Sequence, residues 1–194
     1  MKKLLGKLIL LASGWRFEGA VPAAPKFVLI AAPHTSNWDL VLLLALAAVV
    51  GVRISWMGKY NMFVGPFGWM LKRFGGIPIY RHQRLNMVDQ MVERFAESER
   101  LVLVVPAEAT RGRGEYWKSG FYHIARRAGV PIYTGYLDYR RRRGSFGEPI
   151  MPTGDVRADM DKIRAFYADK VAKYPEKFTP PRLREEDEAI EASA

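Results

Sequence analysis

"KFVLIAAPHTSNWDL", residues 26–40, decides the fold. Its first seven residues are rich in β-formers and run up to Pro33, which is the pattern of a buried strand. Ser36 or Thr35 is placed to cap a helix that runs from about residue 37 to residue 50. A buried strand that leads directly into a helix is the repeating unit of an α/β fold.

The rest of the chain continues this alternation. We predict strands at residues 53–57, 77–81, 101–106, 130–138 and 145–150, and helices at residues 65–76, 84–98, 117–128 and 155–173. Strands that alternate with helices favour a parallel or mixed sheet. With no internal repeat and no clear linker, the sequence predicts a single α/β domain with a mixed, largely parallel central sheet flanked by helices.

The N-terminal segment, residues 1–17, is the first of three expected parts. It is too short to cross a membrane, and Lys7 interrupts the apolar run of a signal peptide. One helical face collects Leu4, Leu8, Leu11 and Trp15. This predicts a short amphipathic helix that either lies in a membrane interface or docks on its own domain. The domain then spans residues 18–178, and a charged, disordered tail spans residues 179–194.

The amino-acid composition limits the kinds of site and the classes of binding partner. The 194 residues include no cysteine, which excludes disulfides, thiolate metal sites and a cysteine nucleophile. The formal net charge is +10 and the pI is about 9.9. Such a chain attracts anionic partners, namely nucleic acid, anionic lipids, phosphorylated metabolites or an acidic carrier protein.

His34 and Asp39 flank the start of the second predicted helix. With Ser36 as the cap, Asp39 is three residues into the helix and reaches back toward it. A neutral histidine oriented by a carboxylate is suited to remove a proton from an alcohol. On its own the spacing is also met by an ordinary polar capping turn.

Three further blocks support a site. "GGIPIYR" presents Arg81 after a strand, and "EATRGRG" presents Glu108, Thr110 and Arg111 after another. Ligands of α/β sheets bind at loops that follow the strands. Arginines there are suited to hold a phosphate through paired donors, although single arginines more often form surface ion pairs.

At these residues the chain resembles the lysophospholipid acyltransferases, the group of 1-acylglycerol-3-phosphate acyltransferase. His34 and Asp39 match that family's histidine–aspartate HX4D motif. Residues 76–81, 108–111 and 130–132 match its three later blocks in order, with Ala109 in place of a glycine. The resemblance covers residues 26–138.

The resemblance implies the glycerolipid acyltransferase fold and an O-acyltransferase. His34 and Asp39 would be catalytic, while Arg81, Glu108, Thr110 and Arg111 would hold the acceptor's phosphate. Ser36, Asn37, Lys59 and Lys118 would support the site. No metal or cofactor is implied, because acyl-CoA or acyl carrier protein already activates the acyl group. The expected acceptor is 1-acylglycerol 3-phosphate (lysophosphatidic acid), in phospholipid biosynthesis. The expected location is cytoplasmic, peripheral on the inner face of the cell membrane.

Alternatives remain at this stage. Within the enzyme class, the alternative acceptors are another lysophospholipid, an aminolipid or a glycolipid. A nucleic-acid-binding protein is the alternative from another class, because "DYRRRRG" at residues 138–144 combines arginines with an aromatic ring. A solvated hairpin turn or a membrane-surface role also explains the same run, and we expect one of these two. The aromatic and methionine-rich residues 56–70 line an acyl-chain groove or pack in the core, and we expect core packing for most of them.

Overall fold

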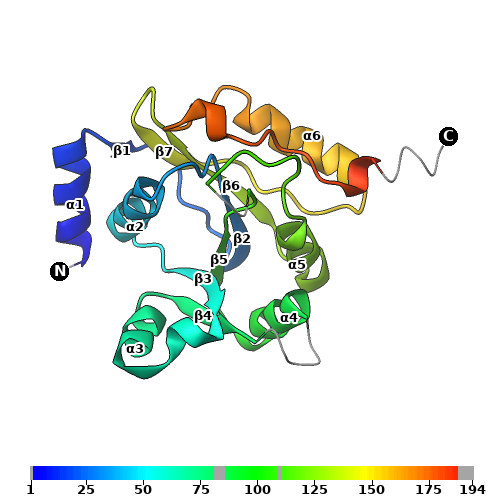
Figure 1. The fold of residues 1–194 in the computed structure, drawn as a ribbon, viewed down its shortest axis with the longest axis horizontal. Helices are drawn as coiled ribbons and strands as arrows, with labels where there is room; N and C mark the ends of the chain where they lie inside the picture. The colour runs from blue at the N-terminus through cyan, green and yellow to red at the C-terminus, as the bar shows by residue number, and fades with distance from the viewer. Residues whose placement is uncertain (1, 81–85, 109–110, 188–194) are drawn as a thin grey trace.

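The computed structural model describes residues 2–80, 86–108 and 111–187 (Figure 1). The helices are α1 (Lys2–Ser13), α2 (Trp38–Val50), η1 (Tyr60–Phe63), α3 (Gly65–Arg73), α4 (Met87–Glu97), α5 (Gly120–Ala128), α6 (Val156–Tyr167) and η2 (Pro175–Lys177). The strands are β1 (Arg16–Phe17), β2 (Lys26–Ala31), β3 (Ile54–Lys59), β4 (Gly76–Ile79), β5 (Leu101–Val105), β6 (Ile132–Asp138) and β7 (Arg143–Phe146).

All seven strands form one sheet in the order β1-β7-β6-β2-β5-β3-β4. Every neighbouring pair is parallel except β6 and β7, which form an antiparallel hairpin. The mixed, largely parallel α/β sheet expected from the sequence is therefore confirmed. Because β2, β5 and β6 are mutually parallel, the loops that follow them meet at one edge of the sheet.

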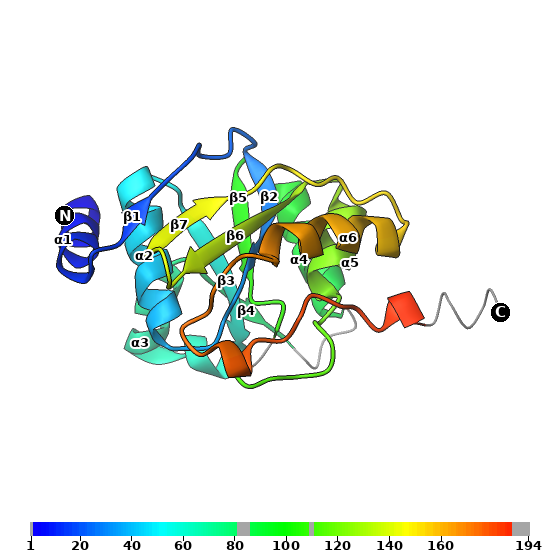
Figure 2. The same ribbon diagram turned by 90° about the horizontal axis from the view of Figure 1, so that it is seen from above.

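Helices cover both faces of the sheet (Figures 1 and 2). The alternation of β2 explains this: Val28 and Ile30 belong to the core cluster under α4, α5 and α6, whereas Phe27 and Leu29 belong to the cluster that meets Leu43 of α2. All four side chains are fully or almost fully buried. A strand buried on both faces reads as a continuous apolar run, as seen at residues 26–32.

Helix α1 lies outside α2 and docks on it through the face opposite to the predicted stripe. Gly6 and Leu10 are buried, and a Cβ at Gly6 would lie 2.7 Å from the carbonyl oxygen of Ala45. Leu4, Leu8 and Leu11 are exposed, together with Leu5, whereas Trp15 is buried. Both alternatives for this helix thus keep a physical basis, because one face docks and the leucine face remains open.

No helix in the described part of the chain is long and apolar enough to cross a membrane.

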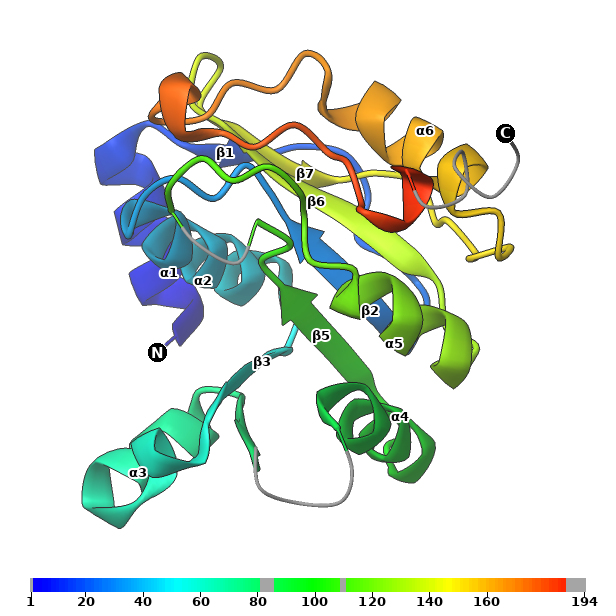
Figure 3. The same ribbon diagram turned by 45° about the vertical axis from the view of Figure 1, so that its right-hand side comes forward.

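The chain after α6 stays on the domain farther than expected. Residues 179–187, assigned from sequence to the disordered tail, include the buried Thr179, Leu183 and Glu186. Glu186 forms an ion pair of 2.8 Å with Arg164 of α6. Figure 3 shows this segment running beside the loop that follows β5. The apolar Leu183 and this ion pair give the segment a reason to pack; residues 188–194 lie outside the described part.

The structure also tests the expectations for two exposed segments, the arginine run and residues 56–70. The arginine run forms the β6–β7 turn, where Arg141 pairs with Asp138 and Asp169 and Arg143 pairs with Glu18. The hairpin-turn interpretation is confirmed. The expectation of core packing for most of residues 56–70 is wrong, because the large apolar side chains from η1 to α3 are mainly exposed: Tyr60, Met62, Val64, Phe67, Trp69 and Met70.

Candidate active site

His34 and Asp39 lie in the connection between β2 and α2. The Nδ1 atom of His34 lies 3.4 Å from Oδ2 of Asp39. Asp39 is buried, while His34 is half-buried and borders a large cavity. With a proton on Nδ1 toward the carboxylate, Nε2 carries the free lone pair, which is the arrangement a general base needs.

Asp39 is fixed by donors from three directions. Its Oδ2 accepts hydrogen bonds from the backbone N–H groups of Thr35 (2.9 Å) and Ser36 (2.8 Å). Its Oδ1 accepts from the hydroxyl of Tyr139 at 2.6 Å. The carboxylate therefore reaches back across the helix start, as the sequence predicted, and cannot rotate away from His34 without losing these bonds.

The predicted cap is displaced by one residue. The helix begins at Trp38 with Asn37 as its N-cap, and Asn37 makes no capping bond through its side chain. The Oγ of Ser36 accepts from the N–H of Trp38 at 3.2 Å. Since the N–H groups of Ser36 and Trp38 are both engaged, neither is free to donate to an oxyanion.

Glu108, from the loop after β5, forms a hydrogen bond with the backbone of the loop that carries His34. Its Oε1 accepts from the backbone N–H of His34 at 2.6 Å, and its Oε2 accepts from the N–H of Thr179 at 3.0 Å. Burial raises the pKa of the Glu108 carboxyl, and the Thr179 and His34 donors offset this only in part. Both oxygens are thus used inside the protein.

Arg111 follows Glu108 and turns toward the dyad. Its guanidinium donates a hydrogen bond to the side-chain oxygen of Asn37. Arg111, Asn37 and Lys118 border the large cavity. Lys59 is exposed at the end of β3 and does not border this cavity. Arg81 and Thr110 lie outside the described residues.

The large cavity has a volume of about 900 Å³ and a mainly apolar wall. It runs along α2 and beside β2, β3 and β5, with His34 and Asp39 at its border. Its apolar wall includes Leu40, Leu43, Leu44, Ala47, Val50, Ile54, Trp56, Leu71 and Phe74. A cavity of this size and character suits a long hydrocarbon chain that ends at the dyad.

Sequence reasoning missed two contacts of this site, Tyr139 and Thr179. Tyr139 directly follows β6, whose carboxyl end lies at the same sheet edge as those of β2 and β5. That position was a usable signal. Thr179 carried no comparable signal. Within the described residues, no group of three or more His, Cys, Asp or Glu side chains could hold a metal ion.

Comparisons with known proteins identify a family and a similar fold. The family described as Acyltransferase matches residues 16–138. No curated protein matches the sequence. Among solved structures, the chain is similar to the 1-acyl-sn-glycerophosphate (LPA) acyltransferase PlsC from Thermotoga maritima, with a TM-score of 0.58 and 18% identity over 83% of this chain and 72% of that chain. At this identity the likeness concerns the fold.

Proposed function

The chain belongs to the Acyltransferase family, and from this premise we propose that it transfers a fatty acyl group from acyl-CoA or acyl carrier protein to the hydroxyl of 1-acylglycerol 3-phosphate, in phospholipid biosynthesis. The observation that carries the proposal is the His34–Asp39 pair at the border of the apolar cavity, next to Arg111. An aminolipid, a glycolipid or another lysophospholipid as acceptor is the alternative that the experiments below separate.

The reaction needs one general base and no covalent enzyme intermediate. Nε2 of His34 takes the proton of the acceptor hydroxyl while its oxygen attacks the thioester carbonyl carbon. The tetrahedral intermediate then collapses, the carbon–sulfur bond breaks, and the leaving thiolate takes the proton back from His34. Asp39 keeps the ring oriented and stabilises its protonated form during the transfer.

The negative charge on the carbonyl oxygen needs a donor in the intermediate. We assign this task to the backbone N–H of Asn37, because the neighbouring N–H groups of Ser36 and Trp38 are already bonded and the Arg111 guanidinium is assigned to the phosphate. The apolar cavity would hold the acyl chain, since it is the large apolar space that the dyad borders.

The acceptor's phosphate would meet Arg111, together with Arg81 and Thr110. We propose a different role for Glu108. Its carboxylate bonds the backbone of His34 and of Thr179, so it positions the catalytic loop instead of contacting the acceptor. Asn37, Ser36 and Lys118 remain supporting residues of the site.

A peripheral position on the inner face of the cell membrane is also part of the proposal. Helices α1 and α3 lie on the same side of the molecule as α2 (Figures 1 and 3). Helix α1 carries exposed leucines, and α3 carries the exposed Phe67, Trp69 and Met70. The Lys2 ammonium lies 4.9 Å from the centre of the Phe74 ring and so joins α1 to the end of α3. Apolar side chains beside lysines suit an anionic lipid surface next to the acyl cavity.

The test measures thiol release from long-chain acyl-CoA and from acyl carrier protein across a panel of lyso-lipid acceptors. We expect release that depends on 1-acylglycerol 3-phosphate and falls at least ~100-fold in His34→Ala, because general-base catalysis typically contributes this much. His123→Ala is the matched control, since His123 pairs with Glu185 away from the cavity. Release that survives in His34→Ala would disprove the general-base role, and preference for another acceptor would reassign the substrate.

A further inference from the structure

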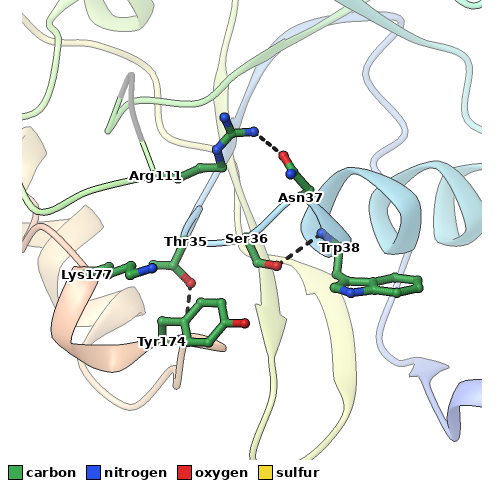
Figure 4. Close-up of a pocket in the computed structure, with 7 residues that line it drawn as sticks. All are labelled: Thr35, Ser36, Asn37, Trp38, Arg111, Tyr174 and Lys177. Carbon is green, nitrogen blue, oxygen red and sulfur yellow. Dashed lines mark hydrogen bonds between the residues drawn. The ribbon is translucent and has the colours of Figure 1, made fainter.

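A second, polar pocket shares Asn37 and Arg111 with the large cavity, and Figure 4 shows the residues that line it. Its volume is about 360 Å³. Three separate segments build it: the loop after β2 with the first residue of α2, the loop after β5, and the chain that follows α6. The lining residues are Thr35, Ser36, Asn37, Trp38, Arg111, Tyr174 and Lys177.

Positive charge gathers at this pocket. Arg111 and Lys177 line it, and the Lys173 ammonium lies beside it, 5.4 Å from the centre of the Trp38 ring. In the part of the chain that the structure describes, none of the three cations takes part in an ion pair, and the lining includes no Asp or Glu. Like charges that converge without neutralisation repel each other, so a bound anion would stabilise the arrangement.

The segment that brings Lys177 is anchored to the catalytic loops on both sides. The N–H of Tyr174 donates to Oγ1 of Thr35 at 3.3 Å. The N–H of Thr179 donates to Glu108, and its carbonyl accepts from the Trp117 indole at 2.7 Å. Lys177 therefore sits between two fixed points, which lowers the cost of ordering it around a ligand. These residues follow the matched family region, residues 16–138.

The polar pocket and the apolar cavity share a boundary. Asn37 and Arg111 border both, and the hydrogen bond between them forms part of the wall. A molecule with an acyl chain in the large cavity and an anionic group in the small pocket would pass directly by His34. This is the shape of a phosphate-bearing substrate that reacts near the junction.

We propose that the polar pocket binds a phosphate group of one of the two substrates, and that Lys177, with Arg111 and Lys173, supplies the charge that holds it. The inference rests on the proposed acyl transfer for the identity of the substrates. The phosphate belongs either to the acceptor headgroup or to the coenzyme A part of the donor, and both present the same chemistry to the pocket.

Equilibrium binding tests the pocket without turnover. Glycerol 3-phosphate and coenzyme A are titrated by calorimetry into the full chain, Lys177→Gln, and the control Arg157→Gln. Arg157 is exposed on α6, outside both cavities, and its variant loses the same charge. We expect Lys177→Gln to weaken the binding of one of the two ligands by about two- to five-fold, the range for an exposed cation, with Arg157→Gln near the parent.

Each outcome decides a point. Weaker glycerol 3-phosphate binding assigns the pocket to the acceptor, and weaker coenzyme A binding assigns it to the donor. No binding of either ligand, or an equal loss in both variants, overturns the pocket. Thiol release is measured on the same preparations. If binding depends on Lys177 but no acyl transfer occurs, the phosphate pocket is supported and the proposed function is refuted. If acyl transfer occurs but Lys177→Gln binds both ligands as the parent does, the function is supported and the pocket is refuted.

Discussion

The hydroxyl of Tyr139 donates a hydrogen bond to the Asp39 carboxylate, with 2.6 Å between the two oxygens. Burial, together with this bond, raises the pKa of the Tyr139 hydroxyl well above its ordinary value, so Tyr139 stays a neutral donor at every working pH. Trp15 packs edge-on against its ring, with 4.9 Å between the ring centres. A chain of contacts thus runs from Trp15, just beyond α1, through Tyr139 and Asp39 to His34.

Tyr139→Phe removes the donor and keeps the ring. We expect kcat to fall about ten-fold, at the lower end for a hydrogen bond to a charged group, because Asp39 loses its hold on one side. The KM for both substrates should stay close to that of the parent, since Tyr139 contacts neither. Tyr122→Phe is the control, because Tyr122 donates to a buried aspartate, Asp159, away from the site at 2.9 Å. An equal loss of kcat in both variants would mean a general loss of stability.

Glu108 makes the stability depend on pH. Its pKa is raised in the folded protein by burial, so the folded state holds this proton more tightly than the unfolded chain. This contribution is complete below the ordinary glutamate pKa and is lost as the pH rises through the raised value. Glu108→Gln has no such proton. We expect its free energy of unfolding, measured by denaturant at a series of pH values, to increase relative to that of the parent as the pH rises through this window.

Glu185→Gln is the control of opposite sign. Although burial acts against it, hydrogen bonds led by that from Ser119 lower the pKa of Glu185. Its contribution is present above the ordinary glutamate pKa and is lost as the pH falls through the lowered value. The free energy of unfolding of Glu185→Gln should therefore decrease relative to that of the parent as the pH rises. If both variants change in the same direction, the assignment for Glu108 is wrong.

Some features of this fold are determined by local sequence and others are not. The apolar runs at residues 26–32 and 101–106 identified the two central strands, because a strand buried on both faces needs only its own sequence to be recognised. The helical wheel of α1 correctly grouped Leu4, Leu8 and Leu11 but could not tell which face docks. The deciding residue was Gly6, whose missing side chain permits close contact with α2 and adds nothing to an apolar stripe.

The same distinction applies to the site. His34 and Asp39 are five positions apart, so the spacing alone suggested their pairing. Tyr139 joins Asp39 across 100 positions, and Thr179 joins Glu108 across 71. Such contacts depend on the packing of loops at the sheet edge, and no local pattern in one sequence records them.

Leu8→Glu tests the membrane face of α1. Leu8 is 55% exposed, so the substitution should leave the midpoint of unfolding unchanged. We expect binding to anionic phospholipid vesicles, measured by co-sedimentation, to fall about ten-fold, because inserting one leucine contributes roughly 1.5 kcal/mol or more. Met151→Glu is the matched control, since Met151 is 53% exposed and precedes α6. Unaltered vesicle binding in Leu8→Glu, or an equal decrease in both variants, would remove α1 from the membrane contact.

Ala47→Phe tests whether the large cavity holds the acyl chain. Ala47 is buried in the cavity wall and lies about 12 Å along α2 from Asp39, at ~1.5 Å per residue. A phenyl ring there shortens the space in front of the dyad. We expect kcat/KM for long-chain acyl donors to fall about ten-fold more than for short-chain donors, because only the long chains reach this depth.

A graded series keeps the cavity test decisive if phenylalanine disturbs folding. Ala47→Leu should give the same selectivity with a smaller effect, and Ala47→Ser, which hardly changes the volume, should leave the chain-length preference of the parent. Thermal unfolding of each variant identifies any that is simply destabilised. A uniform decrease for short and long donors in Ala47→Leu would show that the chain lies elsewhere, because steric shortening must spare the chains that do not reach Ala47.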